Sequence, residues 1–328
     1  MRFLLLLLLA LALGIAGGGY WWVHQPFDDL PTATVDLSIE PGTSGREVAA
    51  DVTQAGVLVN TLLLQLWFRV SGQSRLIRAG SYELDRNTTP RSLLQKLVRG
   101  EEALRSVTLV EGWNFRQVRD ALAKAEQLKP DSAALSSQDI MRELGKPGVS
   151  AEGQFFPDTY TYSKGASDMA VLRRALRAMD KRLAVAWDLR TPQSPLKTPQ
   201  EALILASIVE KETGSPKDRP AIAAVFSNRL RIGMRLQTDP TVIYGLGDSF
   251  DGNLRKKDLL TDTPWNTYTR VGLPPTPIAM PGKASLLAAV QPAASKDLYF
   301  VARGDGSSQF SQSLDEHNRA VNKYQRGQ

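Results

Sequence analysis

Residues 198–213, TPQEALILASIVEKET, hold the most informative stretch of this 328-residue chain. Thr198 can cap a helix, Pro199 suits its first turn, and Glu201 follows three residues after the threonine, as in a capping box. At about 100° per residue, the leucine, isoleucine and alanine side chains that follow cover nearly the whole circumference. The stretch therefore predicts a helix that starts after Thr198 and runs through the middle of a hydrophobic core.

Two carboxylates lie at the end of this predicted helix. Glu210 shares a sector with Leu203 and Ser207, whereas Glu212 lies on the opposite side, so the helix does not bring both into one pocket. A carboxylic acid among apolar neighbours tends to stay protonated, and can donate a proton to a departing glycosidic oxygen before acting as a base. Glu210 is therefore the candidate catalytic residue. The sequence equally allows it to be exposed, or paired with Lys211 or Arg219.

Short strands and helices alternate on the N-terminal side of this helix. A strand at 35–39, helices at 44–53 and 60–70, a strand at 75–84 and a helix from Pro90 to Gly100 predict a βααβα module. Residues 167–189 predict a long helix with a basic, solvated face. A faint repeat about 70 residues apart aligns Gly42, Ser44, Arg46 and Val48 with Gly112, Asn114, Arg116 and Val118. The pattern as a whole predicts an α+β fold.

The N-terminus carries a segment of membrane length. Residues 3–23 include no charged residue and, at about 1.5 Å per residue, would extend roughly 30 Å as a helix. Arg2 precedes the segment, and Asp28 and Asp29 follow its aromatic end, which predicts a cytoplasmic N-terminus with the remainder outside. A cleaved signal peptide is the alternative, because small residues near position 16 offer a processing site.

Composition excludes several kinds of chemistry. The chain contains no cysteine, two histidines (His24 and His317), 42% hydrophobic and 23% charged residues, and a net charge of +6. Disulfide scaffolds, thiolate nucleophiles and cysteine-based zinc sites are thereby excluded, and we expect neither a metal nor a cofactor. The positive charges are spread along the chain without interleaved aromatic residues, so we expect no nucleic-acid partner.

Three segments after the central helix, at 235–245, 265–275 and 278–282, are rich in hydroxyl, amide, aromatic and turn residues. Saccharide sites use this combination, because amides and hydroxyls bind sugar hydroxyls and aromatic rings cover sugar faces. Such loops are also common without any ligand. His317, near the C-terminus, is expected to be a packed or capping residue.

Several motifs together resemble the MltG (YceG-like) family of endolytic murein transglycosylases. They are the N-terminal apolar segment, EGQFFPDTY at 152–160, ASIVEKET at 206–213, LQTDPT at 236–241, NTY at 266–268 with GLPP at 272–275, and the segment 310–318 that ends in EHN. The resemblance covers almost the whole chain, although the first module matches only loosely. It implies a membrane tip and anchor at 1–24, a linker at 25–34, a LysM-like α+β module at 35–105 and a larger mixed α+β YceG-type catalytic domain at 106–328.

The resemblance also implies a function and its residues. The family cleaves the MurNAc–GlcNAc β-1,4 bond inside glycan strands and leaves 1,6-anhydroMurNAc ends, with Glu210 in the position of the general acid and then base. Gln237, Asp239, Asn266 and Tyr268 are the candidates for holding the glycan or orienting Glu210. The implied partners are peptidoglycan strands, the inner membrane, and penicillin-binding proteins and other wall synthases. The catalytic domain would be periplasmic and would terminate or trim nascent strands.

Two other functions fit the same sequence. One is a peptidoglycan hydrolase, in which Asp239 or Glu212 directs a water molecule. The other is a scaffold that binds the wall without cleaving it. Product analysis separates these readings, because only a transglycosylase leaves an anhydro sugar.

Overall fold

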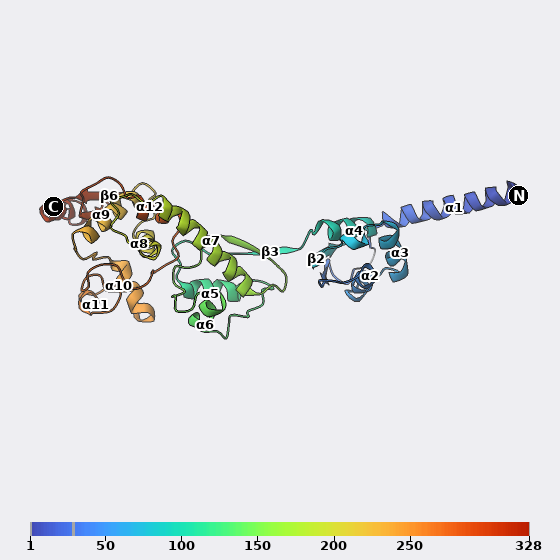
Figure 1. The fold of residues 1–328 in the computed structure, drawn as a ribbon, viewed down its shortest axis with the longest axis horizontal. Coiled ribbons are helices and arrows are strands. Elements are labelled where there is room, and N and C mark those ends of the chain that lie inside the picture. Colours follow the sequence, from blue (N-terminus) through green and yellow to red (C-terminus); the bar gives the residue numbers. More distant parts are fainter. Residues whose placement is uncertain (1, 28–29, 328) are drawn as a thin grey trace. The chain divides into compact units, whose positions relative to one another are not determined.

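The computed structural model describes residues 2–27 and 30–327 (Figure 1). Asp28 and Asp29, which entered the prediction of orientation, lie outside the described residues. The fold is mixed α+β and divides into two units: Met1–Arg105 with Thr161–Gly165, and Ser106–Tyr160 with Ala166–Gln328. Thr161–Gly165 thus belongs to the first unit, whereas the sequence prediction placed it in the larger domain.

An apolar helix, α1 (Arg2–Val23), begins the first unit. Its segment Phe3–Val23 is long and apolar enough to cross a membrane, and a membrane anchor and a signal sequence both fit this description. The side chains from Phe3 to Tyr20 are exposed, while Val23 and the following Phe27 are buried in the core of the first unit. The apolar helix therefore ends directly at the folded module.

The first unit contains the predicted βααβα order. Its elements are β1 (Thr34–Ile39), α2 (Gly45–Gln54), α3 (Thr61–Val70), the 3-10 turn η1 (Ser74–Leu76), β2 (Gly80–Asp85) and α4 (Pro90–Arg99). β1 and β2 are antiparallel, with Leu37 opposite Tyr82, and alternate residues of β1 face the core. The predicted strand at 75–84 is wrong in its first half, because η1 ends at Leu76, residues 77–79 have no regular structure, and the strand starts only at Gly80.

The second unit is mostly helical. Its helices are α5 (Phe115–Lys124), α6 (Ser137–Glu143), α7 (Asp168–Asp188), α8 (Pro199–Glu212), α9 (Arg219–Arg231), α10 (Asp239–Leu246), the 3-10 turn η2 (Gly247–Ser249), α11 (Lys256–Leu260), α12 (Lys283–Val290) and α13 (Leu314–Gln325). β5 (Tyr299–Ala302) pairs with β6 (Ser308–Ser311). β3 (Leu104–Thr108) pairs with β4 (Thr159–Ser163), and the boundary between the units passes through both strands.

Helix α8 occupies the centre of the second unit, as its sequence predicts. Every side chain from Ala202 to Val209 is buried, in a cluster to which α7, α9 and α12 also contribute. The Thr198 hydroxyl accepts the Glu201 N–H at 3.1 Å. The predicted capping box is therefore only half confirmed. The Thr198 half is present, but the Glu201 carboxylate accepts the N–H of Lys197 rather than that of Thr198. The residues at the end of α8, including Glu210, therefore follow a helix that is buried on all sides.

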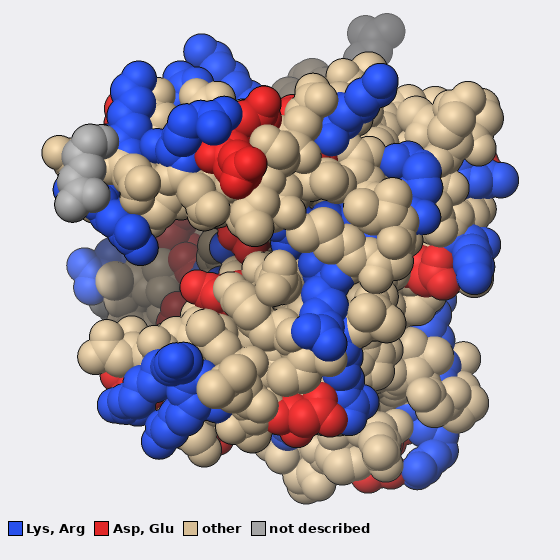
Figure 2. Space-filling view, turned by 90° about the vertical axis from the view of Figure 1, so that its left-hand side faces the viewer, with Lys and Arg blue, Asp and Glu red and all other residues tan. Residues whose placement is uncertain are grey.

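Charged side chains cover much of the surface of the molecule. Figure 2 shows one face, on which Lys and Arg side chains are spread among uncharged ones, and on which acidic side chains lie both at the surface and inside a recess. The apolar residues of the basic helix α7, such as Leu172 and Met179, are buried, and its arginines are mostly exposed. The prediction of a solvated basic face is confirmed.

Candidate active site

Glu210 lies at the buried end of α8. Only 7% of its side chain is exposed, so Glu210 is not an exposed helix end, whereas the alternative of a pair with Arg219 is confirmed. Its Oε2 accepts the backbone N–H of Gly282 at 2.9 Å, and its Oε1 lies 3.7 Å from a terminal nitrogen of Arg219. The Arg219 side chain is 10% exposed, and its Nε has no hydrogen-bond partner among the residues that the structure describes. The buried Glu210 carboxyl therefore lies next to the buried Arg219 guanidinium, whose Nε–H can still donate a hydrogen bond.

A short segment, Ile278–Gly282, brings the Gly282 N–H to Glu210. The hydroxyl of Ser207, one turn before Glu210 on α8, accepts the Ile278 N–H at 3.0 Å and donates to the Ile204 carbonyl at 2.7 Å. On its other side, Met280 exchanges two backbone hydrogen bonds with Gly112 and Trp113, at 2.8 and 2.7 Å. The segment is thus fixed between α8 and the turn that follows β3.

That turn brings a second carboxylate, Glu111, which the sequence analysis missed. A Cβ on Gly282 would overlap the Glu111 carboxylate, so Glu111 and Glu210 both contact the same glycine. Burial raises the pKa of Glu111, the negative charge of Glu210 raises it further, and Arg219 opposes both effects. The centre therefore contains two carboxyls and one guanidinium at the N-terminus of α12.

Gly112, which lies beside the Glu210 side chain, and Lys211, the residue after Glu210, help to line a groove of about 750 Å³, although Glu210 is not itself among the lining residues. The rings of Tyr244 and Trp265 meet edge to face in its wall, with centroids 5.6 Å apart. Asn114, Gln117 and Arg116 add amide and guanidinium groups. The groove therefore combines aromatic surface with polar donors, as expected for a saccharide site.

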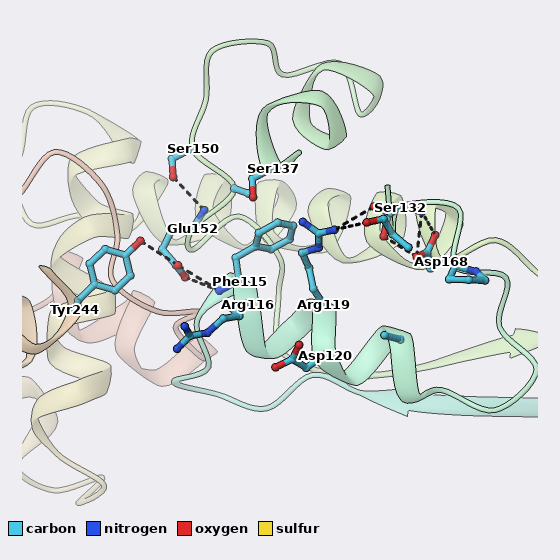
Figure 3. Close-up of a pocket in the computed structure, with 14 residues that line it drawn as sticks. Phe115, Arg116, Arg119, Asp120, Ser132, Ser137, Ser150, Glu152, Asp168 and Tyr244 are labelled. Carbon is cyan, nitrogen blue, oxygen red and sulfur yellow. Dashed lines mark hydrogen bonds between the residues drawn. The ribbon is translucent and has the colours of Figure 1, made fainter. Parts of the chain in front are cut away.

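A neighbouring pocket of about 620 Å³ shares Arg116, Glu152 and Tyr244 with the groove (Figure 3). Glu152 is 5% exposed and accepts the N–H of Phe115, the first residue of α5, at 3.1 and 3.2 Å. The Tyr244 hydroxyl donates to it at 3.2 Å. Burial raises the pKa of Glu152 to about 7, although these hydrogen bonds oppose the shift. Glu152 thus joins α5 to the aromatic wall of the groove.

Three of the four predicted binding residues line a different pocket, of about 640 Å³. Gln237, Asp239 and Tyr268 lie there with Glu212, and the Tyr268 hydroxyl donates to Asp239 at 2.5 Å. Glu212 accepts a hydrogen bond from the Thr238 hydroxyl, and burial raises its pKa. Glu212 lines this pocket and Glu210 does not, as expected for two residues that lie on different sides of α8.

Asn266, the fourth predicted residue, is fully buried. Its amide nitrogen donates to the backbone carbonyls of Asp258, Leu259 and Thr261 at 2.7–3.2 Å. Its Oδ1 accepts the N–H of Tyr268 at 2.8 Å. Asn266 therefore acts on the pocket through the backbone of Tyr268, because its own side chain is fully used in holding the loop.

The histidine near the C-terminus, His317, lines the pocket that also contains Glu212. His317 stacks on Tyr299, with ring centroids 5.2 Å apart, as a packed residue would. Within residues 2–27 and 30–327, no three His, Asp or Glu side chains are grouped so that they could hold a metal ion.

The chain is similar to known proteins over nearly its whole length. Residues 37–323 match the YceG-like family. An endolytic murein transglycosylase of Bacillus subtilis is 30% identical, over 94% of this chain and 91% of its own length. One from Streptococcus pneumoniae is 28% identical over 97% of this chain, which spans 64% of that longer protein. A crystal structure of a YceG-like protein from Listeria monocytogenes is 29% identical with a TM-score of 0.57, covering 88% of this chain and 98% of the other. The chain therefore belongs to the YceG-like family.

Proposed function

We propose that this protein is an endolytic murein transglycosylase, a lyase that cuts peptidoglycan strands internally and leaves 1,6-anhydroMurNAc ends. Two relatives of this name, at 28–30% identity, support the activity. The observation that carries the catalytic assignment is the nearly buried carboxyl of Glu210, held by the Gly282 N–H beside Arg219.

In the proposed mechanism Glu210 first acts as a general acid. It gives its proton to the oxygen that leaves C1 of MurNAc, and the bond between C1 and that oxygen breaks. The same carboxylate then takes the proton of the C6 hydroxyl as the C6 oxygen bonds to C1. Glu210 ends protonated as it began, and water does not enter the product. One carboxyl can therefore serve both steps.

Glu111 is the second carboxyl of the centre, and we assign it a positioning role that acts through Glu210. Burial and the negative charge of Glu210 raise the pKa of Glu111, and Arg219 limits this effect. Glu111 and Glu210 both contact Gly282, so a change at Glu111 is expected to alter how the Gly282 N–H meets Glu210.

The groove beside Glu210 supplies a surface for the glycan. Tyr244 and Trp265 would cover sugar faces, while Asn114 and Gln117 would bind sugar hydroxyls. Gln237, Asp239 and Tyr268 would hold a further part of the strand in their own pocket, and Asn266 would orient Tyr268. Binding on both sides of α8 suits an enzyme that cuts within strands rather than at their ends.

The remaining parts of the proposal concern location. We propose that α1 anchors the protein in the inner membrane with the N-terminus in the cytoplasm, and that the 35–105 module is LysM-like. The 106–328 domain would then act in the periplasm, where it terminates or trims nascent strands near penicillin-binding proteins and other wall synthases. The apolar segment Phe3–Val23 supports an anchor or a signal sequence.

The deciding experiment is mass spectrometry of products from purified glycan strands. Wild type should release fragments that end in 1,6-anhydroMurNAc, and Glu210→Gln should release none. Glu143→Gln, which changes an exposed carboxylate on α6, serves as the matched control and should be fully active. Reducing MurNAc ends that carry solvent oxygen would instead support a hydrolase using Glu212 or Asp239. Binding without cleavage by the wild type would support a scaffold.

A further inference from the structure

Helix α3 of the first unit is apolar on two sides. Leu64 and Phe68 point into the core and are buried. Leu62, Leu63, Leu66 and Val70 are exposed by 73%, 45%, 56% and 73%, and together they define the outer face of α3. A contiguous apolar face on a folded unit marks an interaction site far more often than scattered single residues do.

The outer face of α3 is continuous with the end of the membrane-length helix. Leu63, Leu66 and Val70 line one apolar groove of about 470 Å³ together with the last turns of α1, from Ile15 to Val23. Trp67 also lines it and donates its indole N–H to the Pro90 carbonyl at 3.1 Å. If α1 crosses a bilayer, this groove lies where the helix leaves it.

Arginines border the same face. Arg46 and Arg69 lie beside Leu62 and Leu66 in an adjoining pocket. Arg91 lines the apolar groove itself, and its guanidinium lies 2.7 Å from Nε2 of His24. A helix with leucines on one face and arginines at its margin is typical of segments that lie in a membrane interface, where the cations meet lipid phosphates.

We infer that the outer face of α3 inserts into the outer surface of the membrane that α1 crosses, so that the first unit rests on the lipid. The occupant of this face is thus a phospholipid bilayer, in which apolar side chains enter the acyl boundary and the three arginines bind phosphate groups. This inference rests on the anchoring part of the proposed function.

The absence of cysteine from the chain permits a direct test with single spin labels. The full-length protein would be reconstituted in vesicles of zwitterionic lipid with about one-third anionic phospholipid, carrying a label at Leu8→Cys, Leu66→Cys or Leu104→Cys. Leu104 is the matched control, because it is an exposed leucine of the first unit, at 52%, outside the α3 face. Collision with oxygen, which concentrates in lipid, is compared with collision with a water-soluble nickel complex.

Each outcome has a defined meaning. We expect the Leu8 and Leu66 labels to favour oxygen and the Leu104 label to favour the nickel complex. If the Leu8 label favours oxygen while the Leu66 label behaves like Leu104, the inference is overturned and the anchor stands. If the Leu8 label itself favours the nickel complex, the anchoring proposal fails. Replacing Arg46 and Arg69 with glutamine should make the Leu66 label more accessible to nickel, and an unchanged ratio would refute the part assigned to these arginines.

Discussion

Replacing Gly282 with alanine would place a methyl group against the Glu111 carboxylate, at the residue whose N–H binds Glu210. Forcing a methyl group into a packed site costs about 1–3 kcal/mol. Gly282 is also the N-cap of α12, where alanine is worse than glycine by roughly 0.5–1 kcal/mol. If the site stays rigid, the free energy of unfolding should therefore fall by about 1.5–4 kcal/mol.

The strain can instead be relieved by movement, because the overlapping atoms belong to the far end of a side chain. In that case Glu111 or the Gly282 N–H shifts, and the hydrogen bond to Glu210 is weakened. Loss of a hydrogen bond costs about 0.5–1.5 kcal/mol, which corresponds to roughly 2- to 10-fold in kcat. Chemical denaturation and the rate of anhydro-product formation would measure the two parts of the effect.

A double-mutant cycle assigns the effect to this contact. Glu111→Ala removes the carboxylate that the new methyl group would meet, so the double variant should be more stable than the sum of the single effects by about 1 kcal/mol or more. Gly214→Ala is the control, because a Cβ there meets open space just beyond α8. Additivity of Gly282→Ala and Glu111→Ala to within about 0.5 kcal/mol would refute the arrangement described for the centre.

Three further changes test other contacts. Because the folded-state pKa of Glu152 is raised to about 7, the folded protein holds a proton that the unfolded chain releases above about pH 4.5, so stability should fall as pH rises between these values and level off above pH 7. Glu152→Gln should abolish that slope in pH-dependent denaturation, and an unchanged slope would contradict the assignment. Ser207→Ala leaves the buried Ile278 N–H without its acceptor and should cost about 1–3 kcal/mol of unfolding free energy; a loss below about 0.5 kcal/mol would show that the segment is held otherwise. Asn266→Ala should cost about 2–3 kcal/mol by calorimetry, since three carbonyls lose their donor, and a neutral effect would argue against its structural role.

The central helix could be predicted because its signals are local. A capping threonine, a proline in the first turn and the apolar circumference are all read within sixteen residues, and the structure confirms where α8 starts and how it is buried. The same is true of α4, which begins at Pro90 and ends at a left-handed Gly100. The start and end of a helix can be predicted without the tertiary fold where they depend on residues adjacent in the sequence.

Glu111 could not be found in this way. It approaches Glu210 because Gly112 and Trp113 form backbone hydrogen bonds with Met280. The sequence near Glu111 does not predict those hydrogen bonds. One signal was available in the faint repeat, which aligns Gly112 with Gly42. Both glycines have positive φ, but Pro41 precedes one and Glu111 the other. The presence of Glu111 before Gly112, where the other copy of the repeat has Pro41 before Gly42, is the sequence feature that distinguishes this turn.

The candidate binding residues illustrate a different limit. Gln237, Asp239 and Tyr268 share a pocket, as their common loop chemistry suggests, but which face of α8 they serve depends on how α10 packs. The type of side chain also did not distinguish residues that could bind a ligand from residues that hold the loop. Asn266 is of the second kind, because its buried amide donates hydrogen bonds to three carbonyls of its own loop. Composition identifies polar loops without indicating which of their groups remain free.

The strand segment Thr161–Gly165 makes the link between the units more than a single tether. The chain leaves the first unit after Arg105, returns at Thr161 and leaves again after Gly165. Within the first unit, the Lys164 carbonyl accepts the Ser81 hydroxyl at 3.1 Å, and Lys164 forms an ion pair with Asp36. A protease that cuts only at Arg105 would therefore leave residues 106–328 attached to the first unit through the contacts of Thr161–Gly165. Release of the second unit requires this returning segment to be cut or displaced as well.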